Sequence, residues 1–148
     1  MDRAGRSGMD CHQEVITMMT QVAEDEGRKL LLIDDNDLVR NVLHEVLEIS
    51  GYSVIDAVDG EDGINAFRNN NQHIRLIISD VLMPKKNGKE VYDEVRKINQ
   101  DINILFISGY PDDLLANNLT QDDKMYFLPK PVRPADFITT IQTILNNN

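Results

Sequence analysis

The sequence lacks the features that would mark a secreted, disulfide-bonded or membrane-spanning protein. It has a single cysteine, Cys11, so no internal disulfide bond can form. No apolar stretch approaches the roughly 20 residues that a membrane-spanning helix needs, and the N-terminus has no hydrophobic signal core. These absences predict a soluble, cytoplasmic protein in a reducing compartment.

Basic residues are also in short supply. Fifteen Lys and Arg residues face 25 Asp and Glu residues, which gives a formal net charge of −10 at pH 7. Such a charge argues against nucleic acid or an anionic membrane as the main partner. The 148 residues suffice for one domain with a modest extension, and the apolar fraction of 41% supports one core.

The first 27 residues are predicted to form an extension to a domain at residues 28–148. Residues 1–8 are small, polar and charged, which is typical of a disordered lead-in. Residues 11–26 carry apolar side chains at helical spacing, and Gly27 is placed to end an amphipathic helix there. This helix either packs on its own domain as a linker or contacts a partner or a second copy.

Strand-like and helix-like segments alternate five times along the rest of the chain. The strand-like segments are residues 29–33, 52–57, 75–79, 102–107 and 125–128. Such alternation predicts βαβ units and therefore an α/β fold with a doubly wound, five-stranded parallel sheet. The second strand is polar and the fifth is short, so we expect them at the two edges, in the strand order 2-1-3-4-5.

The helices between these strands differ in how much they can bury. The first is expected to bury one stripe, made of Leu38, Val39, Val42, Leu43, Val46 and Leu47, and to end at Gly51. Asp59 is expected to cap the second, and Asn87 with Glu90 the third, which buries a face running to Ile98. The fourth, at about residues 112–119, has little to bury; Pro134 is placed to begin the fifth.

Acidic side chains stand at the ends of two predicted strands. Asp34 and Asp35 follow the run at 30–33, and Asp80 follows the run at 75–79. The carboxyl ends of parallel strands meet at one edge of the sheet, where ligands bind. One Asp there is usually a helix cap, but three neighbouring carboxylates repel one another, and a hard cation such as Mg²⁺ would relieve that repulsion. The pattern predicts a phosphoryl acceptor at Asp80 beside a Mg²⁺ site.

Lys130 and Ser108 are placed to join this site. Lys130 stands between Pro129 and Pro131, which restrict the backbone on both sides. That rigidity suits an ammonium group that must meet an anion, although a lone lysine is usually a surface residue. Ser108 ends the fourth strand, where its hydroxyl either satisfies the turn or donates to a phosphoryl oxygen.

Four groups of residues therefore stand in order along the chain: Asp34-Asp35, Asp80 with Met83-Pro84 and Gly88, Ser108-Gly109, and Lys130-Pro131. Together, over residues 28–146, they resemble the receiver domain of two-component response regulators. The resemblance implies a flavodoxin-like (βα)5 fold and a signalling switch rather than an enzyme. It implies that Asp80 accepts a phosphoryl group, with Mg²⁺, from a histidine kinase or a phosphotransfer protein.

The resemblance also assigns roles to single residues. It implies that Asp34, Asp35, Asp80 and the backbone carbonyl of Leu82 hold Mg²⁺, while Lys130 and Ser108 contact the phosphoryl oxygens. Phe127 takes the aromatic switch position, where the hydroxyl of the more usual tyrosine is missing.

The resemblance also implies a switch and a reset. Phosphorylation is expected to draw Ser108 inward and let Phe127 fill the vacated space, which would alter the face of the fourth helix, fifth strand and fifth helix. This face, or the N-terminal helix, is the expected contact of a homodimer. By the same resemblance, Leu82 and Tyr110, which the motif does not fix, would flank the path of the attacking water. Since neither offers a carboxylate or amide, we expect a long-lived acyl phosphate.

Other functions fit the residues less well. A Mg²⁺-dependent phosphohydrolase of the haloacid dehalogenase type needs a second acid two residues after the acceptor, where Leu82 stands. A dinucleotide-binding domain needs glycines in the turn at 34–37, which has none. A degenerate receiver would not keep the acidic set and Lys130. A free-standing regulator and a receiver within a hybrid histidine kinase are both compatible with the sequence.

Overall fold

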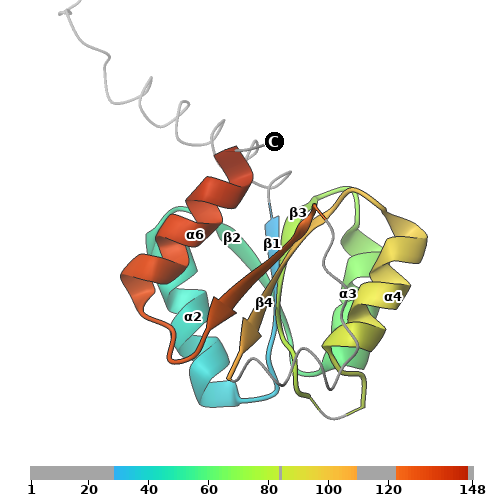
Figure 1. The fold of residues 1–148 in the computed structure, drawn as a ribbon, viewed down its shortest axis with the longest axis horizontal. Helices are drawn as coiled ribbons and strands as arrows, with labels where there is room; N and C mark the ends of the chain where they lie inside the picture. Colours follow the sequence, from blue (N-terminus) through green and yellow to red (C-terminus); the bar gives the residue numbers. More distant parts are fainter. Residues whose placement is uncertain (1–28, 84, 110–122, 147–148) are drawn as a thin grey trace, which may run out of the picture.

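The computed structural model describes residues 29–83, 85–109 and 123–146. Five strands are present: β1 (Lys29–Ile33), β2 (Ser53–Ala57), β3 (Ile74–Asp80), β4 (Asn103–Ser108) and β5 (Met125–Pro129). They pair in parallel as one sheet with the order β2-β1-β3-β4-β5 (Figure 1). The predicted fold class, the strand order and the two edge strands are therefore confirmed.

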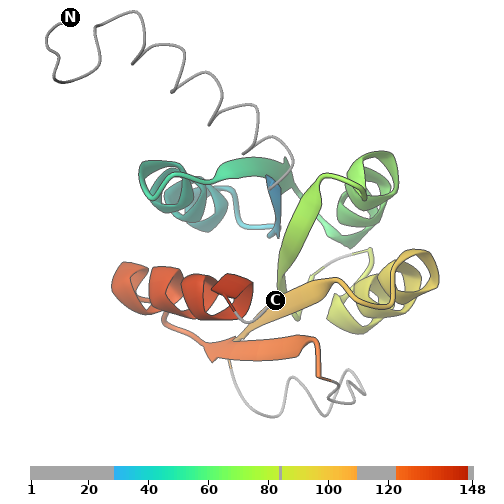
Figure 2. The same cartoon turned by 90° about the horizontal axis from the view of Figure 1, so that it is seen from above.

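Helices cover both faces of this sheet. They are α2 (Asp37–Ile49), α3 (Gly60–Asn70), α4 (Gly88–Ile98) and α6 (Pro134–Asn146). Helices α2 and α6 lie on one face and α3 and α4 on the other (Figures 1 and 2). The helices predicted at 11–26 and at 112–119 lie outside the described residues. Among the helices that are described, none has the length and apolarity to cross a membrane.

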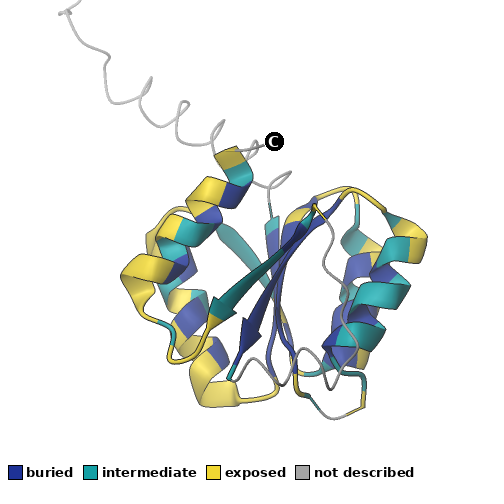
Figure 3. Ribbon diagram, viewed as in Figure 1, coloured by how far each residue is buried: buried dark blue, intermediate teal, exposed yellow. Residues whose placement is uncertain are grey.

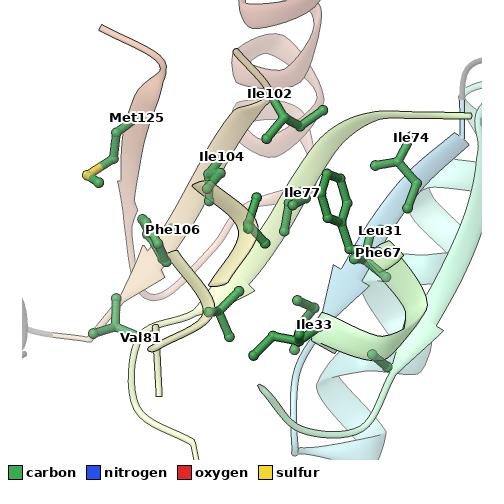
Figure 4. Close-up of a cluster of buried hydrophobic side chains, with 14 residues drawn as sticks. Leu31, Ile33, Phe67, Ile74, Ile77, Val81, Ile102, Ile104, Phe106 and Met125 are labelled. Carbon is green, nitrogen blue, oxygen red and sulfur yellow. The ribbon is translucent and has the colours of Figure 1, made fainter. Parts of the chain in front are cut away.

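The three inner strands are buried, whereas the edge strands β2 and β5 are only partly covered (Figure 3). Alternate side chains of β1 enter two separate cores, as expected for a sheet covered on both faces. Leu31 and Ile33 join the core under α3 and α4, beside Phe67 (Figure 4). Leu30 and Leu32 join the core under α2 and α6. The inner strands are thus packed on both faces of the sheet.

The predicted helix ends are present. Asn87 and Glu90 form the expected capping box on α4, each side chain accepting from the other residue's backbone N–H. The side chain of Asp59 caps α3 by accepting from the backbone N–H of Asp62 at 2.8 Å. Gly51 follows α2 with a φ of +97°, a backbone conformation that glycine adopts without strain.

The predicted buried stripe of α2 is wrong in its first turns. Leu43 and Leu47 are buried, but Leu38, Val39 and Val42 are 74%, 39% and 50% exposed. The residue buried in the first turn is instead Arg40. The N-terminal turns of α2 line the cavity at the carboxyl edge of the sheet, so the apolar side chains there meet open space.

A similar error affects the end of α4. Val91 and Val95 are fully buried as predicted, but Ile98 in the last turn is 36% exposed. In both helices, the apolar periodicity predicted the buried face correctly in the middle of the helix but extended it too far at one end.

Candidate functional site

The strand register brings the predicted site residues to one edge of the sheet. Ile33 of β1 pairs with Ser79, and Asp80 of β3 pairs with Ile107. Ser108 ends β4 opposite Pro129 of β5. The residues that end β1, β3, β4 and β5 therefore lie at the same edge, as the C-terminal edge of a doubly wound sheet requires.

Three carboxylates meet at this edge. Asp34, Asp35 and Asp80 each offer an oxygen atom, and these atoms all lie within 4.8 Å of one another. Asp34 and Asp80 are only 3% and 8% exposed, while Asp35 is exposed. Carboxylate oxygens in a partly solvated cluster are the ligands that Mg²⁺ takes together with water. The donor set therefore fits a hard divalent cation.

The pKa of Asp34 is raised above its ordinary value, in part by the neighbouring carboxylates. Burial raises the pKa of Asp34, and the backbone N–H of Asn36, which donates to its Oδ1 at 2.9 Å, opposes that effect. Asp80 raises the pKa further, Lys130 lowers it and Asp35 raises it, which leaves it above the ordinary value. A cation bound at the cluster would favour the charged form of Asp34.

Lys130 reaches the same cluster from the edge strand. Its Nζ lies 3.0 Å from Oδ2 of Asp80; the side chain of Lys130 is 40% exposed and that of Asp80 is 10% exposed. The backbone N–H of Lys130 donates to the carbonyl of Ser108 at 2.8 Å, and the Lys130–Pro131 peptide bond is cis. The ammonium group is thus held at the border between solvent and the buried acid, where an incoming anion would meet it.

The remaining predicted residues lie in different surroundings. Ser108 is buried at the end of β4, and Leu82, two residues after Asp80, is 53% exposed. Phe127 instead stacks on Phe106, with ring centroids 5.9 Å apart and an interplanar angle of 23°, and packs against the core under α3 and α4. Tyr110 lies outside the described residues.

A cavity of about 910 Å³ opens beside the acids and is mainly apolar on its far wall. Asp34, Asp80 and Lys130 lie at one side of it. The rest of its lining is Leu38, Val39, Val42, Leu43, Leu82, Ile107, Gly109, Pro131 and Val132. The exposed first turns of α2 therefore form a wall next to the acceptor rather than part of a core.

Two residues that the sequence interpretation missed support the loops of this site. The Nη1 of Arg40 donates to the backbone carbonyl of Asp34 at 2.7 Å, beneath the first acidic loop. Gly60, at the start of α3, lies so close to the second loop that a Cβ there would be 1.8 Å from the carbonyl oxygen of Lys86. Arg40 shares the helical spacing of Leu43 and Leu47, and this charge on a buried face was a usable signal.

Comparison with known proteins agrees with this geometry. A sequence model described as "Response regulator receiver domain" matches residues 30–142. The chain is 35% identical over 116 residues to the sensor kinase CckA of Brucella abortus (strain 2308), covering 78% of this chain and 12% of the kinase. It is 34% identical over 122 residues to the transcriptional regulatory protein CpxR of Escherichia coli (strain K12), covering 81% of this chain and 50% of the regulator.

Solved structures show the same fold. The crystal structure of the receiver domain from the hybrid histidine kinase CckA is similar with a TM-score of 0.68 and 31% identity, covering 79% of this chain and 98% of that one. A response regulator receiver domain protein from Clostridium thermocellum gives a TM-score of 0.71 at 28% identity, covering 81% and 95% of the two chains. The match thus covers nearly the whole length of these two receiver-domain structures, whereas the chain spans only 12% of the sensor kinase and 50% of the transcriptional regulator.

Proposed function

From the premise that this chain belongs to the response regulator receiver domain family, we propose that it is a phosphorylation-activated switch with Asp80 as its acceptor. The observation that carries the proposal is the placement of Asp80, which is buried at the edge of the sheet beside two other acids and lies 3.0 Å from the ammonium group of Lys130. A carboxylate so placed has a countercharge and an open cavity before it.

The proposed reaction is a phosphoryl transfer. An oxygen of Asp80 attacks the phosphorus of a phosphohistidine, so the phosphorus–nitrogen bond breaks as the acyl phosphate forms. Lys130 and Ser108 would bind the phosphoryl oxygens. Mg²⁺, held by Asp34, Asp35, Asp80 and the carbonyl of Leu82, would neutralise the phosphoryl charge. Phosphoryl transfer depends on positioning and charge neutralisation, so the protein would catalyse only its own phosphorylation and dephosphorylation.

The donor would be a histidine kinase or a phosphotransfer protein. A protein donor could bind to the exposed apolar surface of α2 beside the acceptor, which is formed by Leu38, Val39 and Val42. One relative is a sensor kinase and another a transcriptional regulator. A free-standing regulator and a receiver within a hybrid kinase both fit the proposal, and each would work in the cytoplasm without contacting nucleic acid through this domain.

Switching would run from Ser108 to Phe127. The two side chains lie on adjacent strands, and Phe127 stacks on Phe106 one strand inward. Movement of Ser108 toward a bound phosphoryl group would let the ring of Phe127 shift. The partner face would be β5, α6 and the segment between β4 and β5, with a symmetric dimer as one outcome.

The lifetime of the acyl phosphate would depend on Leu82 and Tyr110. The side chain of Leu82 is half exposed on the cavity wall and carries no group that can orient a water molecule. We expect hydrolysis to be slow, with the kinase or another protein needed for a fast reset. The same residue gives no second acid for a phosphohydrolase of the haloacid dehalogenase type.

Phosphorylation of purified variants tests the proposal. Incubation with a small phosphodonor and Mg²⁺ should add one phosphate to the wild type, as seen by intact mass, and none to Asp80→Asn. Asp93→Asn is the matched control, because Asp93 pairs with Lys89 on α4 away from the site. It should be phosphorylated like the wild type. A phosphorylated Asp80→Asn protein would show that the acceptor is another residue.

A further inference from the structure

A buried guanidinium lies on the face of α2 that packs on the sheet. Arg40 is only 8% exposed and follows the spacing of the core residues Leu43 and Leu47. Arginine is seldom buried unless its charge and donors are satisfied. An apolar side chain would pack well at this position, so the hydrogen bonds that Arg40 makes are what distinguish it there.

Arg40 donates to both sides of the first acidic loop. Its Nη1 donates to the backbone carbonyl of Asp34 at 2.7 Å, and its Nη2 to Oδ1 of Asp37 at 2.6 Å. The side chain of Asp37 is 79% exposed, so water could replace that partner. The carbonyl of Asp34 is buried, and without Arg40 it would lose this donor.

The carbonyl that Arg40 binds belongs to the peptide unit joining Asp34 to Asp35. That unit is planar, so fixing its oxygen also fixes the direction in which the chain leaves Asp34. On the other side, the backbone N–H of Asp34 donates to the carbonyl of Ala57 at 3.2 Å. We propose that Arg40 is a positioning residue that clamps the Asp34–Asp35 peptide and so sets the spacing of the two carboxylates that bind the metal.

The clamp needs the shape of arginine as well as its charge. The planar guanidinium presents donors in a fixed fork, so one side chain meets the carbonyl of Asp34 and the carboxylate of Asp37 together. A lysine at this position keeps the charge but offers a single ammonium group that cannot span both acceptors in the same geometry.

This inference rests on the proposed function, because it assumes that the acidic pair holds Mg²⁺. Groups that orient metal ligands typically change metal affinity by about 10–100-fold when they are removed. Loss of Arg40 would let the 34–35 peptide turn and the carboxylates separate. The dissociation constant for Mg²⁺ should then rise by about tenfold in Arg40→Met, and less in Arg40→Lys.

The test is calorimetric titration of Mg²⁺ into each variant, at a temperature where circular dichroism shows it to be folded. Arg96→Met is the matched control. Arg96 also donates to a backbone carbonyl, that of Ile102 at 2.8 Å, but before β4 at the opposite end of the sheet. Arg96→Met should lose stability and keep its Mg²⁺ affinity.

Three results would overturn the inference. Arg40→Met that is folded and binds Mg²⁺ like the wild type would show that the clamp does not set the ligands. An equal loss of affinity in Arg96→Met would show a general effect of stability. Full affinity in Arg40→Lys would show that the fork is not needed. If the wild type neither binds Mg²⁺ nor becomes phosphorylated, the proposed function itself fails, which is a distinct outcome.

Discussion

The two loops that reach the acidic cluster are held in different ways. The loop between β1 and α2, at 34–36, is fixed by side-chain hydrogen bonds. Arg40 binds the carbonyl of Asp34, and Asn36 caps α2 by accepting from the N–H of Val39. The loop between β3 and α4, described at 81–83 and 85–87, has a cap of the same kind at Asn87, but it is also packed closely against the start of α3 at Gly60.

This difference decides what each loop can tolerate. The second loop has little spare room: a Cβ on Gly60 would overlap the carbonyl of Lys86, and one on Gly88 would lie 3.1 Å from the Cα of Val81. Lys85 in this loop has a φ of +67°, an uncommon conformation for a residue with a side chain. We therefore expect the first loop to tolerate the loss of a single hydrogen bond better than the second loop tolerates one added methyl group at Gly60.

The largest expected effect is in the tightly packed loop. Gly60→Ala should destabilise the domain by about 1–3 kcal/mol, because the added methyl group meets backbone atoms that cannot move aside without shifting the loop. Asn36→Ala removes one cap from the other loop and should cost about 1 kcal/mol. Urea unfolding would measure both. A Gly60→Ala protein as stable as the wild type would remove the contrast between the loops.

The second prediction separates the ligands that the two loops contribute. Mg²⁺ at about 100 times its dissociation constant should stabilise the wild type by about 2.7 kcal/mol. Asp35→Ala should lose most of this gain, because the first loop would contribute a ligand through this side chain. Leu82→Ala should keep it, because the second loop would contribute a backbone carbonyl that the substitution leaves in place.

Thermal unfolding with and without Mg²⁺ gives the measurement. Without metal, Asp35→Ala should be at least as stable as the wild type, since it has one charge fewer in the cluster. An unchanged response to Mg²⁺ in Asp35→Ala would place the cation elsewhere.

Some features of the site follow from the local sequence pattern and could be predicted. Others depend on contacts between residues far apart in the sequence and could not. Asp34, Asp35 and Asp80 end apolar runs, and the alternation of elements sends such ends to one edge, so their meeting was predictable. The close approach of Gly60 to Lys86 joins residues 60 and 86, and nothing in the local sequence of either indicates it.

The α2 helix shows the same limit on a smaller scale. Its periodicity predicted the buried positions Leu43 and Leu47. It could not show that Leu38 and Val42 would line an open cavity instead of packing on the sheet. Nor could it show that Arg40 would face a buried carbonyl, because that acceptor belongs to the preceding loop.

The smallest expected effect is a pH dependence of stability that comes from His44 on α2. The ring of His44 lies 2.8 Å from Oδ1 of Asp56 on β2 and 3.2 Å from Oε1 of Glu48. Burial lowers the pKa of His44, but the hydrogen bonds and charges of Asp56 and Glu48 outweigh it, and the net pKa is raised. The stabilisation is therefore complete below the unfolded pKa of about 6.5 and is lost as the pH rises through the folded value.

We expect His44→Gln to be less stable than the wild type at about pH 5.5, by less than about 1 kcal/mol, and the difference to shrink at about pH 9. Thermal unfolding at the two pH values would measure it, with His73→Gln, whose side chain is exposed, as control. A stability difference that stays constant with pH would show that the protonated ring does not fasten α2 to β2.

The ion pair between Lys130 and Asp80 joins positions 50 residues apart in the chain. Asp34 and Asp80 follow β1 and β3, which pair directly in the middle of the sheet, whereas Lys130 follows the edge strand β5, two strands away from β3. An edge strand is paired on one side only, so local opening of β5 would remove the lysine and leave the acids in place. We therefore expect the ability to accept a phosphoryl group to depend on whether β5 is paired in the sheet.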